Sequence, residues 1–133
     1  MKRIELRVGE PLCEYGQVTS IRDVESITFG MFNKLAYEKA VVIYLDMKNV
    51  PTYIEEPHAI GSKSGCIIDI PRIVTIALNT LSSGVILLHN HPSGNNKPSE
   101  QDRKITNELR TALNYFQIKL LDSIVVGTEY TQI

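Results

Sequence analysis

The stretch that decides the fold is Val85-Ile86-Leu87-Leu88-His89-Asn90-His91-Pro92-Ser93-Gly94-Asn95-Asn96-Lys97-Pro98-Ser99-Glu100-Gln101-Asp102. Its apolar start predicts a strand that is buried on both faces. Pro92 has no N–H to donate, so it ends the strand, and a turn-rich loop follows. Ser99 is a good helix N-cap with Asp102 three residues later, near the capping-box spacing. We therefore expect a helix from about Ser99 to Phe116.

Outward from this stretch, strands and helices alternate along the chain. The expected strands are residues 4–8, 40–45, 52–56, 85–88, 118–126 and a short one near 130. Two earlier helices are predicted by apolar stripes at Val24, Ile27, Met31 and Leu35, and at Val74, Ala77, Leu78 and Leu81 after Pro71. At least one strand pair is an antiparallel hairpin. The pattern predicts an α/β fold, a single-domain αβα sandwich over residues 1–133 with a mixed sheet and helices on both faces.

The amino-acid composition argues against some classes of function. Fourteen basic residues against fifteen acidic ones give a net charge of −1. Phosphate neutralisation supplies most nucleic-acid affinity, so tight DNA binding by this domain alone is not expected. Cys13 and Cys66 form no C-x-x-C pair and suit a reducing compartment. No apolar run approaches the ~20 residues that span a bilayer. We expect a cytoplasmic protein without membrane contact.

Three side chains of the deciding stretch are candidate zinc ligands. His89 and His91 lie two residues apart in extended chain, so both imidazoles project to the same face. Asp102 falls on the apolar stripe of its helix, where a carboxylate is costly unless a bound dication compensates its charge. This stripe continues through Ile105, Leu109, Ala112 and Phe116. Three such ligands with a fourth position left for water are typical of a catalytic zinc site.

Each of these residues also has an ordinary explanation when taken alone. H-x-H pairs are common among surface and core histidines. Ser99 is explained as a helix cap, and Asp102 as a first-turn acid favoured by the helix dipole. A carboxylate must also take the proton from a water nucleophile. The residues alone do not choose among Glu25, Glu38, Glu55 and Glu56 for that task.

The combination resembles a known family. The pattern H-x-H, seven residues, Ser, two residues and Asp is the signature of JAMM (MPN-type) metalloproteases, and His89, His91, Ser99 and Asp102 match it in full. The segment H-N-H-P-S-G is similar to the bacterial RadC-like branch. Further similarity lies in residues 44–49 (YLDMKN), 69–72 (DIPR) and 120–122 (LLD). The resemblance covers roughly residues 20 to 130 and implies the cytidine-deaminase-like MPN/JAB fold.

The resemblance also implies roles. Glu38, just before the first long buried strand, is the expected general base, and Ser99 is expected to donate a hydrogen bond to the developing oxyanion. The implied activity is that of a zinc-dependent hydrolase, a metallopeptidase or isopeptidase acting on a protein or peptide. The alternatives are a DNA-repair-associated accessory domain and a metal domain that holds partners together.

The sequence departs from the family pattern in two places. RadC-like proteins usually have His where Ser123 stands, and a helix-hairpin-helix segment precedes their domain but is not expected here. Outside the motif, His58 is expected in a loop beside Pro57, and Cys66 is expected as a small core residue. An exposed edge at residues 4–8 would allow pairing with a second copy of the chain.

Overall fold

The buried apolar runs of the sequence form the centre of a five-stranded sheet with the order β2-β1-β3-β4-β5. The computed structural model describes residues 15–63 and 65–133. The strands are β1 (Lys39–Leu45), β2 (Pro51–Ile60), β3 (Gly84–Asn90), β4 (Lys119–Val126) and β5 (Tyr130–Gln132). The expected strand at residues 4–8 lies outside the described residues.

The sheet is mixed, as predicted. β1 runs antiparallel to both β2 and β3, whereas β3 and β4 are parallel and β5 is antiparallel to β4. A parallel pair needs a long crossover connection, and here the helix α3 (Glu100–Tyr115) supplies it. The metal motif therefore stands where β3 ends and its crossover begins.

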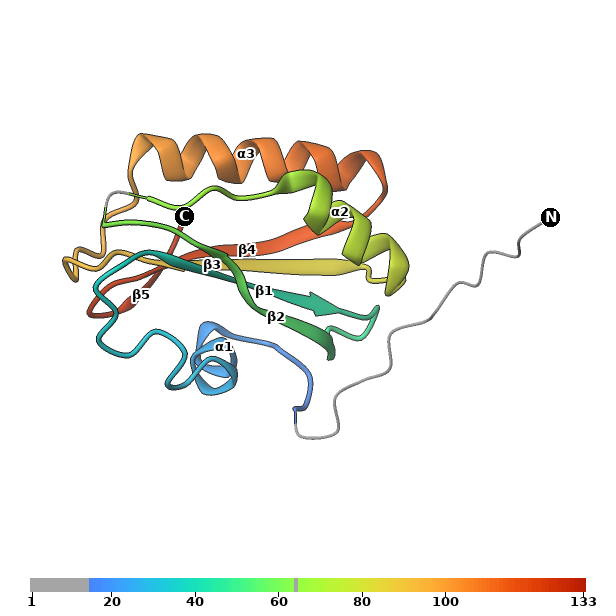
Figure 1. Ribbon diagram of the computed structural model, residues 1–133. Helices are drawn as coiled ribbons and strands as arrows, with labels where there is room; N and C mark the ends of the chain where they lie inside the picture. Colours follow the sequence, from blue (N-terminus) through green and yellow to red (C-terminus); the bar gives the residue numbers. More distant parts are fainter. Residues whose placement is uncertain (1–14, 64) are drawn as a thin grey trace.

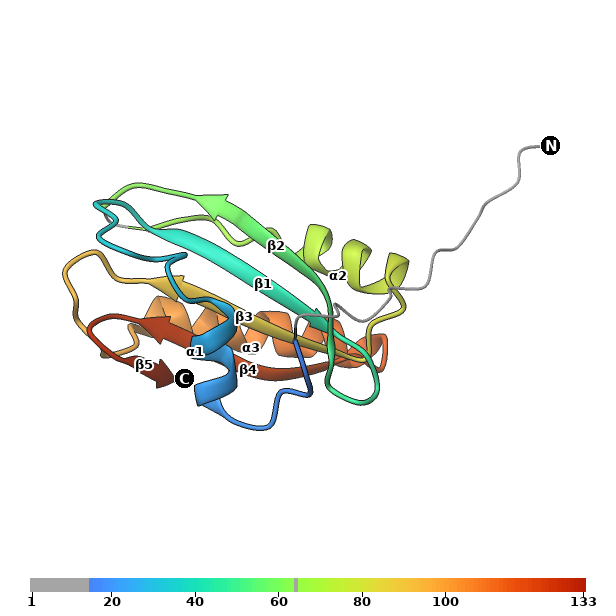
Figure 2. The ribbon, with the colours of Figure 1, turned by 90° about the horizontal axis from the view of Figure 1, so that it is seen from below.

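Helices cover both faces of this sheet. α2 (Ile70–Asn79) and α3 lie on one face, and α1 (Ile21–Ile27) lies on the other (Figures 1 and 2). The central strands contribute side chains to the core on both faces of the sheet, because alternate residues point to opposite faces. Val42 and Leu87 pack in the cluster under α2 and α3, whereas Ile43 and Leu88 pack in the cluster against α1. The αβα sandwich predicted from the sequence is confirmed.

The first helix is shorter than its apolar spacing predicted. α1 ends at Ile27, so Met31 lies in a turn beyond it and Leu35 lies in irregular chain. The hydroxyl of Thr28, the C-cap, bonds back to the carbonyl of Val24 at 2.8 Å. Gly30 then takes a positive φ of 82°, which turns the chain away from helical geometry. Local polar chemistry overrode the periodicity here.

The apolar stripes of the two later helices agree with the expected positions only in part. In α2 the buried positions are Ile73 and Ala77, while Leu78 is 41% exposed and Leu81, beyond the helix, is 51% exposed. In α3 the stripe reaches Leu109 and Leu113. Ala112 is only partly buried, and Phe116 is an exposed C-cap. Ala77 and Leu109 are buried as predicted, whereas Leu78, Leu81 and Phe116 are exposed.

The second strand is longer than the expected 52–56, because it continues through Pro57 to Ile60. His58 is therefore a strand residue, and its expected place in a loop is wrong. Within the described part of the chain, no helix is long and apolar enough to cross a membrane.

Candidate metal centre

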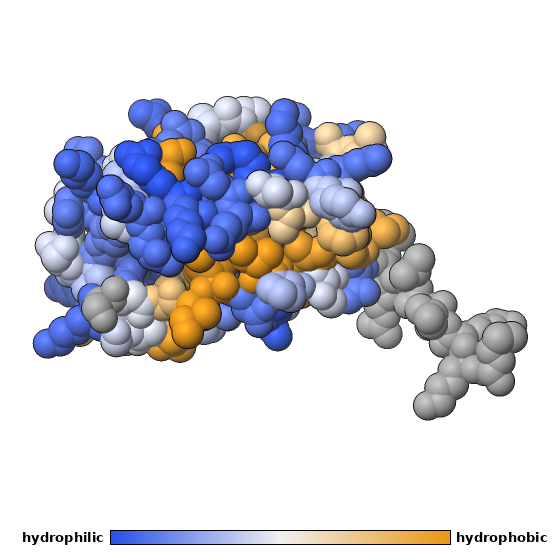
Figure 3. Space-filling model, turned by 90° about the horizontal axis from the view of Figure 1, so that it is seen from above, coloured by the Kyte–Doolittle hydropathy of each residue, from blue (hydrophilic) through white to orange (hydrophobic). Residues whose placement is uncertain are grey.

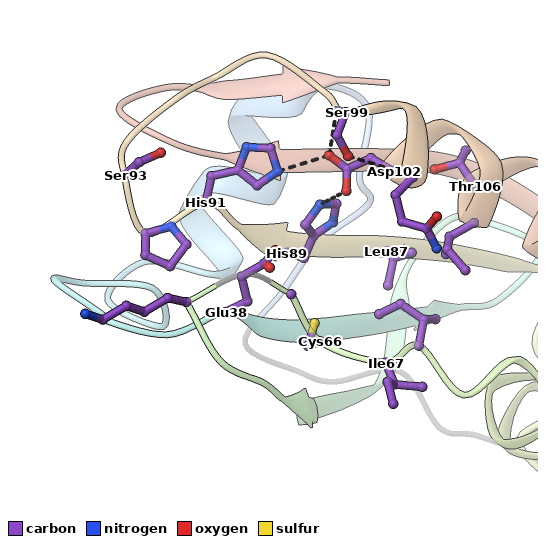
Figure 4. Close-up of a pocket in the computed structure, with 16 residues that line it drawn as sticks. Glu38, Cys66, Ile67, Leu87, His89, His91, Ser93, Ser99, Asp102 and Thr106 are labelled. Atoms are coloured by element: carbon purple, nitrogen blue, oxygen red, sulfur yellow. Dashed lines mark hydrogen bonds and ion pairs between the residues drawn. The ribbon is translucent and has the colours of Figure 1, made fainter.

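The two histidines of the motif meet one carboxylate at the C-terminal end of β3. His89 Nε2 lies 2.9 Å from Asp102 Oδ1, and His91 Nε2 lies 3.0 Å from Asp102 Oδ2 (Figure 4). His89 is buried and His91 is half-buried. The three side chains that the sequence nominated as ligands are thus brought together, with one nitrogen of each ring aimed at the same carboxylate.

The N-terminus of α3 fixes Asp102. The Ser99 hydroxyl accepts the Asp102 N–H at 3.0 Å, and the Ser99 N–H donates to Asp102 Oδ2 at 2.8 Å, which completes a capping box. Partial burial on its own would raise the pKa of Asp102. Hydrogen bonds from His89 and from the Ser99 N–H outweigh it and hold the pKa of this carboxyl well below its ordinary value. Asp102 is therefore an anion ready to face a cation.

The donor set fits a divalent cation. His91 Nδ1 lies 3.0 Å from the Asn95 carbonyl oxygen, which can only accept, so Nδ1 carries the proton. In a neutral ring Nε2 then has a lone pair, and that lone pair faces the oxygen of Asp102. His91 Nε2 and Asp102 Oδ2 would then both be hydrogen-bond acceptors 3.0 Å apart. Such a pair needs either a second proton on the imidazole ring or a cation between the two atoms. Nitrogen and carboxylate oxygen are ligands that zinc accepts, and the carbonyl behind the imidazole is the usual device that orients a ligating histidine.

Glu38 comes to the same place from the neighbouring strand. It directly precedes β1, is only 8% exposed, and its carboxylate oxygen and one ring nitrogen each of His89 and His91 all lie within 4.8 Å of one another. Burial raises the pKa of Glu38, although the nearby histidines oppose this rise. Glu38, His89 and His91 form a group that could hold a metal ion, and Asp102 contacts both of its histidines. The division of these four residues into ligands and base stays a prediction.

Asn90, between the two histidines, holds Glu38 in place. Its neighbours point to one face and it points to the other, where its Oδ1 accepts the Lys39 N–H at 2.7 Å. Its Nδ2 donates to the Tyr37 carbonyl at 3.0 Å. The amide thus bridges the peptides on both sides of Glu38. We did not identify Asn90 from the sequence, although a buried polar residue inside an apolar strand is a usable signal.

Hydrogen bonds from Asn96 hold the loop after His91. Asn96 Oδ1 accepts the Glu129 N–H at 2.9 Å and Asn96 Nδ2 donates to the Thr128 hydroxyl at 3.0 Å, which ties the loop to the turn between β4 and β5. The backbone at Gly127 runs so close that an added Cβ would lie 2.7 Å from the Gly94 oxygen and 2.8 Å from the Asn95 oxygen. Sequence reasoning missed Asn96 and Gly127, because their partners are distant in the chain.

Ser123, the departure from the family pattern, is buried on β4 beside α3. Its hydroxyl pairs with the Thr106 hydroxyl at 2.8 Å, so the position joins strand to helix. Cys66 is partly buried and packs against the core cluster, in line with its expected place, and it also lines the site. Burial raises the pKa of its thiol to about 11.

His58 belongs to a separate polar cluster. Its Nε2 accepts the Asp69 N–H at 3.0 Å, so Nδ1 is the protonated nitrogen and donates to Glu55 Oε1 at 2.6 Å. The other oxygen of Glu55 accepts from Arg72 Nε at 2.6 Å. Glu55 is buried and fully engaged, so it is not available to the metal centre. This cluster joins β2 to the start of α2. The segment between these two elements faces the histidines.

A pocket of about 370 Å³ opens over these groups. It is bounded by α3, by the end of β3 and by residues 63–68 apart from position 64 (Figure 4). Glu38, His89, His91, Ser99 and Asp102 all line it. This volume lies in the lower part of the usual range for small-ligand sites, ≈ 300–1,000 Å³. All five predicted site residues therefore share one cavity.

Comparison with known proteins identifies relatives of this chain. The chain is 33% identical over 126 residues to a UPF0758 protein of Methanosarcina mazei, which covers 95% of the chain and 53% of that relative. It is 36% identical over 110 residues to a UPF0758 protein of Caldanaerobacter subterraneus, covering 83% of the chain and 47% of that protein. The chain thus spans about half the length of these curated relatives. A model of the RadC-like JAB domain matches residues 18–132, and the chain belongs to this family.

Proposed function

We propose that this chain is a zinc-dependent hydrolase of peptide or isopeptide bonds. The observation that carries the proposal is the convergence of a desolvated Glu38 with His89 and His91, within 4.8 Å, while Asp102 meets both histidines. His89, His91 and Asp102 would hold the ion. Bound zinc would supply Lewis acidity and lower the pKa of a coordinated water toward neutrality.

The residues around that position have complementary tasks. Glu38 accepts a proton from the attacking water and returns it to the leaving amine. Burial raises its pKa, which brings a carboxylate closer to the range in which a general base works well at neutral pH. The Ser99 hydroxyl oxygen accepts the Asp102 N–H, which leaves its own O–H to donate to the developing oxyanion.

The test measures zinc content and peptide hydrolysis on the same protein samples. We expect about one zinc per chain in the parent protein, and the same content in Glu38→Gln, which keeps the shape of the side chain but cannot accept the proton. Hydrolysis of a fluorogenic peptide mixture should fall by roughly 100-fold or more in Glu38→Gln. Glu25→Gln, on the exposed face of α1, serves as the matched control and should match the parent.

Two other results would redirect the proposal. Full metal content without hydrolysis in the parent would favour the partner-binding alternative. Tight DNA association at low salt that weakens steeply with added salt would favour the accessory role in DNA repair. Equal hydrolysis by Glu38→Gln and the parent would remove Glu38 from the general-base role.

A further inference from the structure

The pocket over the metal centre has two chemically different halves. One half holds Glu38, His91 and Ser93, and the other lies beyond His89 (Figure 4). In Figure 4, Ser93 and His91 stand at one end, while Leu87, Ile67 and Thr106 stand at the opposite end. His89 and Asp102 lie between the two halves, so a ligand bound at the centre reaches both.

The half beyond His89 is apolar. Its floor is Leu87, which is buried on β3 two residues before His89 and on the same face. Its sides are Ile105 from α3 and Cys66 and Ile68 from the segment that precedes α2, all of them partly buried. These residues also pack against the core under the two helices, so the walls are supported by a close-packed interior.

The polar atoms near this half are already engaged or uncharged. The Thr106 hydroxyl pairs with Ser123, so it is not offered to a ligand. Burial raises the pKa of the Cys66 thiol to about 11, so the thiol stays neutral at physiological pH. A charged side chain placed here would lose its hydration, and an anionic one would also face Glu38 and Asp102.

From this arrangement we propose that the half formed by Leu87, Ile105, Ile68 and Cys66 is a specificity subsite for a neutral apolar side chain next to the scissile bond. The proposal rests on the proposed hydrolase function and adds the substrate class to it. Continuity with the metal centre decides the occupant, because the residue beside the bond that is cleaved is the one placed within reach of this half.

The surface around the subsite extends the same preference. The view onto the helix layer shows hydrophobic side chains in a band beside a hydrophilic surface (Figure 3). Ile67 is 88% exposed at the edge of the pocket, where a side chain of this size would otherwise face water. Residues of the substrate flanking the apolar one would cover Ile67, which is consistent with a peptide rather than a single amino acid as ligand.

The experiment measures binding without relying on hydrolysis. The full chain, as purified and again after chelation of any metal, carries isotope-labelled isoleucine and leucine methyl groups and is titrated with the N-acetyl amides of leucine, glycine and aspartate. We expect the leucine compound to shift the Ile68, Ile105 and Leu87 methyl signals and to bind roughly tenfold more tightly than the other two, because only it buries an apolar side chain.

Two variants locate the binding. Ile105→Gln keeps a good helix former at a half-buried position but places an amide in the subsite, and it should lower the affinity for the leucine compound roughly fivefold or more. Ile68→Gln does the same from the opposite wall and guards against a folding defect in the first variant. Leu78→Gln, in α2 but outside the pocket lining, is the matched control and should leave binding unchanged.

Equal affinity for the three compounds in both metal states, or an equal loss in Leu78→Gln and Ile105→Gln, would overturn the subsite. Peptide hydrolysis is a separate readout on the same samples. A retained preference for the leucine compound without any hydrolysis would end the proposed function and leave the subsite standing. Hydrolysis without a preference for the leucine compound would leave the proposed function standing and would overturn the subsite.

Discussion

The side-chain amide of Asn90 spans the backbone of Glu38. It accepts the Lys39 N–H at 2.7 Å and donates to the Tyr37 carbonyl at 3.0 Å, so the two peptides flanking the proposed base are held by one side chain. Asn90 lies between the two histidines of the motif. The short strand end therefore carries two ligand candidates on one face and the anchor of the base on the other.

This relationship makes Asn90 a positioning residue. Asn90→Asp keeps an acceptor for the Lys39 N–H but loses the donor to Tyr37, so the base should shift relative to the histidines. We expect kcat to fall roughly 10- to 100-fold with KM and zinc content nearly unchanged. Steady-state kinetics and elemental analysis together check this. A proportional loss of zinc would show that Asn90 acts on the ligands instead.

Gly127→Ala should disturb the metal centre without touching a candidate ligand. Its Cβ would lie 2.7 Å from the Gly94 oxygen and 2.8 Å from the Asn95 oxygen, and neither backbone atom can move freely. The Asn95 carbonyl holds His91 Nδ1, so we expect zinc affinity to fall about 10- to 100-fold. Competition with a chelator measures the affinity. Gly16→Ala, where nothing lies within 4 Å of an added Cβ, is the control and should bind zinc like the parent.

Asp102→Asn should change how acid affects the metal-free protein. The pKa of Asp102 is lowered in the folded state, so its contribution to the free energy of unfolding is fully present above its unfolded pKa of about 3.9 and is lost as pH falls toward the folded value. In chelator, the parent should therefore exceed Asp102→Asn in stability near pH 5, and the gap should narrow below about pH 4. Urea unfolding across that range checks this. A gap that widens in acid would reverse the assigned sign.

Glu55→Gln should destabilise the fold without entering the chemistry. Glu55 is buried and accepts from both His58 and Arg72 at 2.6 Å, and hydrogen bonds to charged groups contribute about 1.5–3 kcal/mol each. Because the Arg72 side chain is largely exposed, we expect a loss of about 1–2 kcal/mol in the free energy of unfolding. Glu56→Gln, at a more exposed carboxylate that pairs with Lys39, is the neighbouring control and should lose about 1 kcal/mol or less. Denaturant melts of the two variants compare them directly, and equal losses would contradict the special place of Glu55.

The order of elements and the identity of the site followed from local chemistry. The runs at Ala40–Leu45 and Val85–Leu88 predicted strands buried on both faces, and the sheet places them side by side at its centre. Ser99 predicted the start of α3, because a hydroxyl before the first turn satisfies a free backbone N–H. The spacing of His89 and His91 predicted convergence, because extended chain repeats every two residues.

Other features depended on polar contacts, backbone angles and packing rather than on apolar spacing. The end of α1 was set by the bond from the Thr28 hydroxyl to Val24 and by the positive φ of Gly30, and apolar spacing does not register either. In α2 the predicted burial of Ala77 is confirmed, but the tertiary packing buries Ile73 and leaves Leu78 exposed. The predicted length of α1 and the predicted burial of Leu78 were wrong for this reason.

The sequence by itself predicted the αβα sandwich and the candidate ligands His89, His91 and Asp102, since periodicity, capping and motif spacing are local properties of the chain, whereas Glu38 was predicted from the family resemblance. Only the tertiary structure decided that Asn90 brackets Glu38, that Gly127 lies against the loop behind His91, and that Glu55 serves His58 and Arg72 instead of a metal. Asn90 and Lys39 are 51 residues apart, and Glu55 and Arg72 are 17 residues apart. Such pairings are fixed by strand order and register, and those become definite only when the whole sheet is assembled.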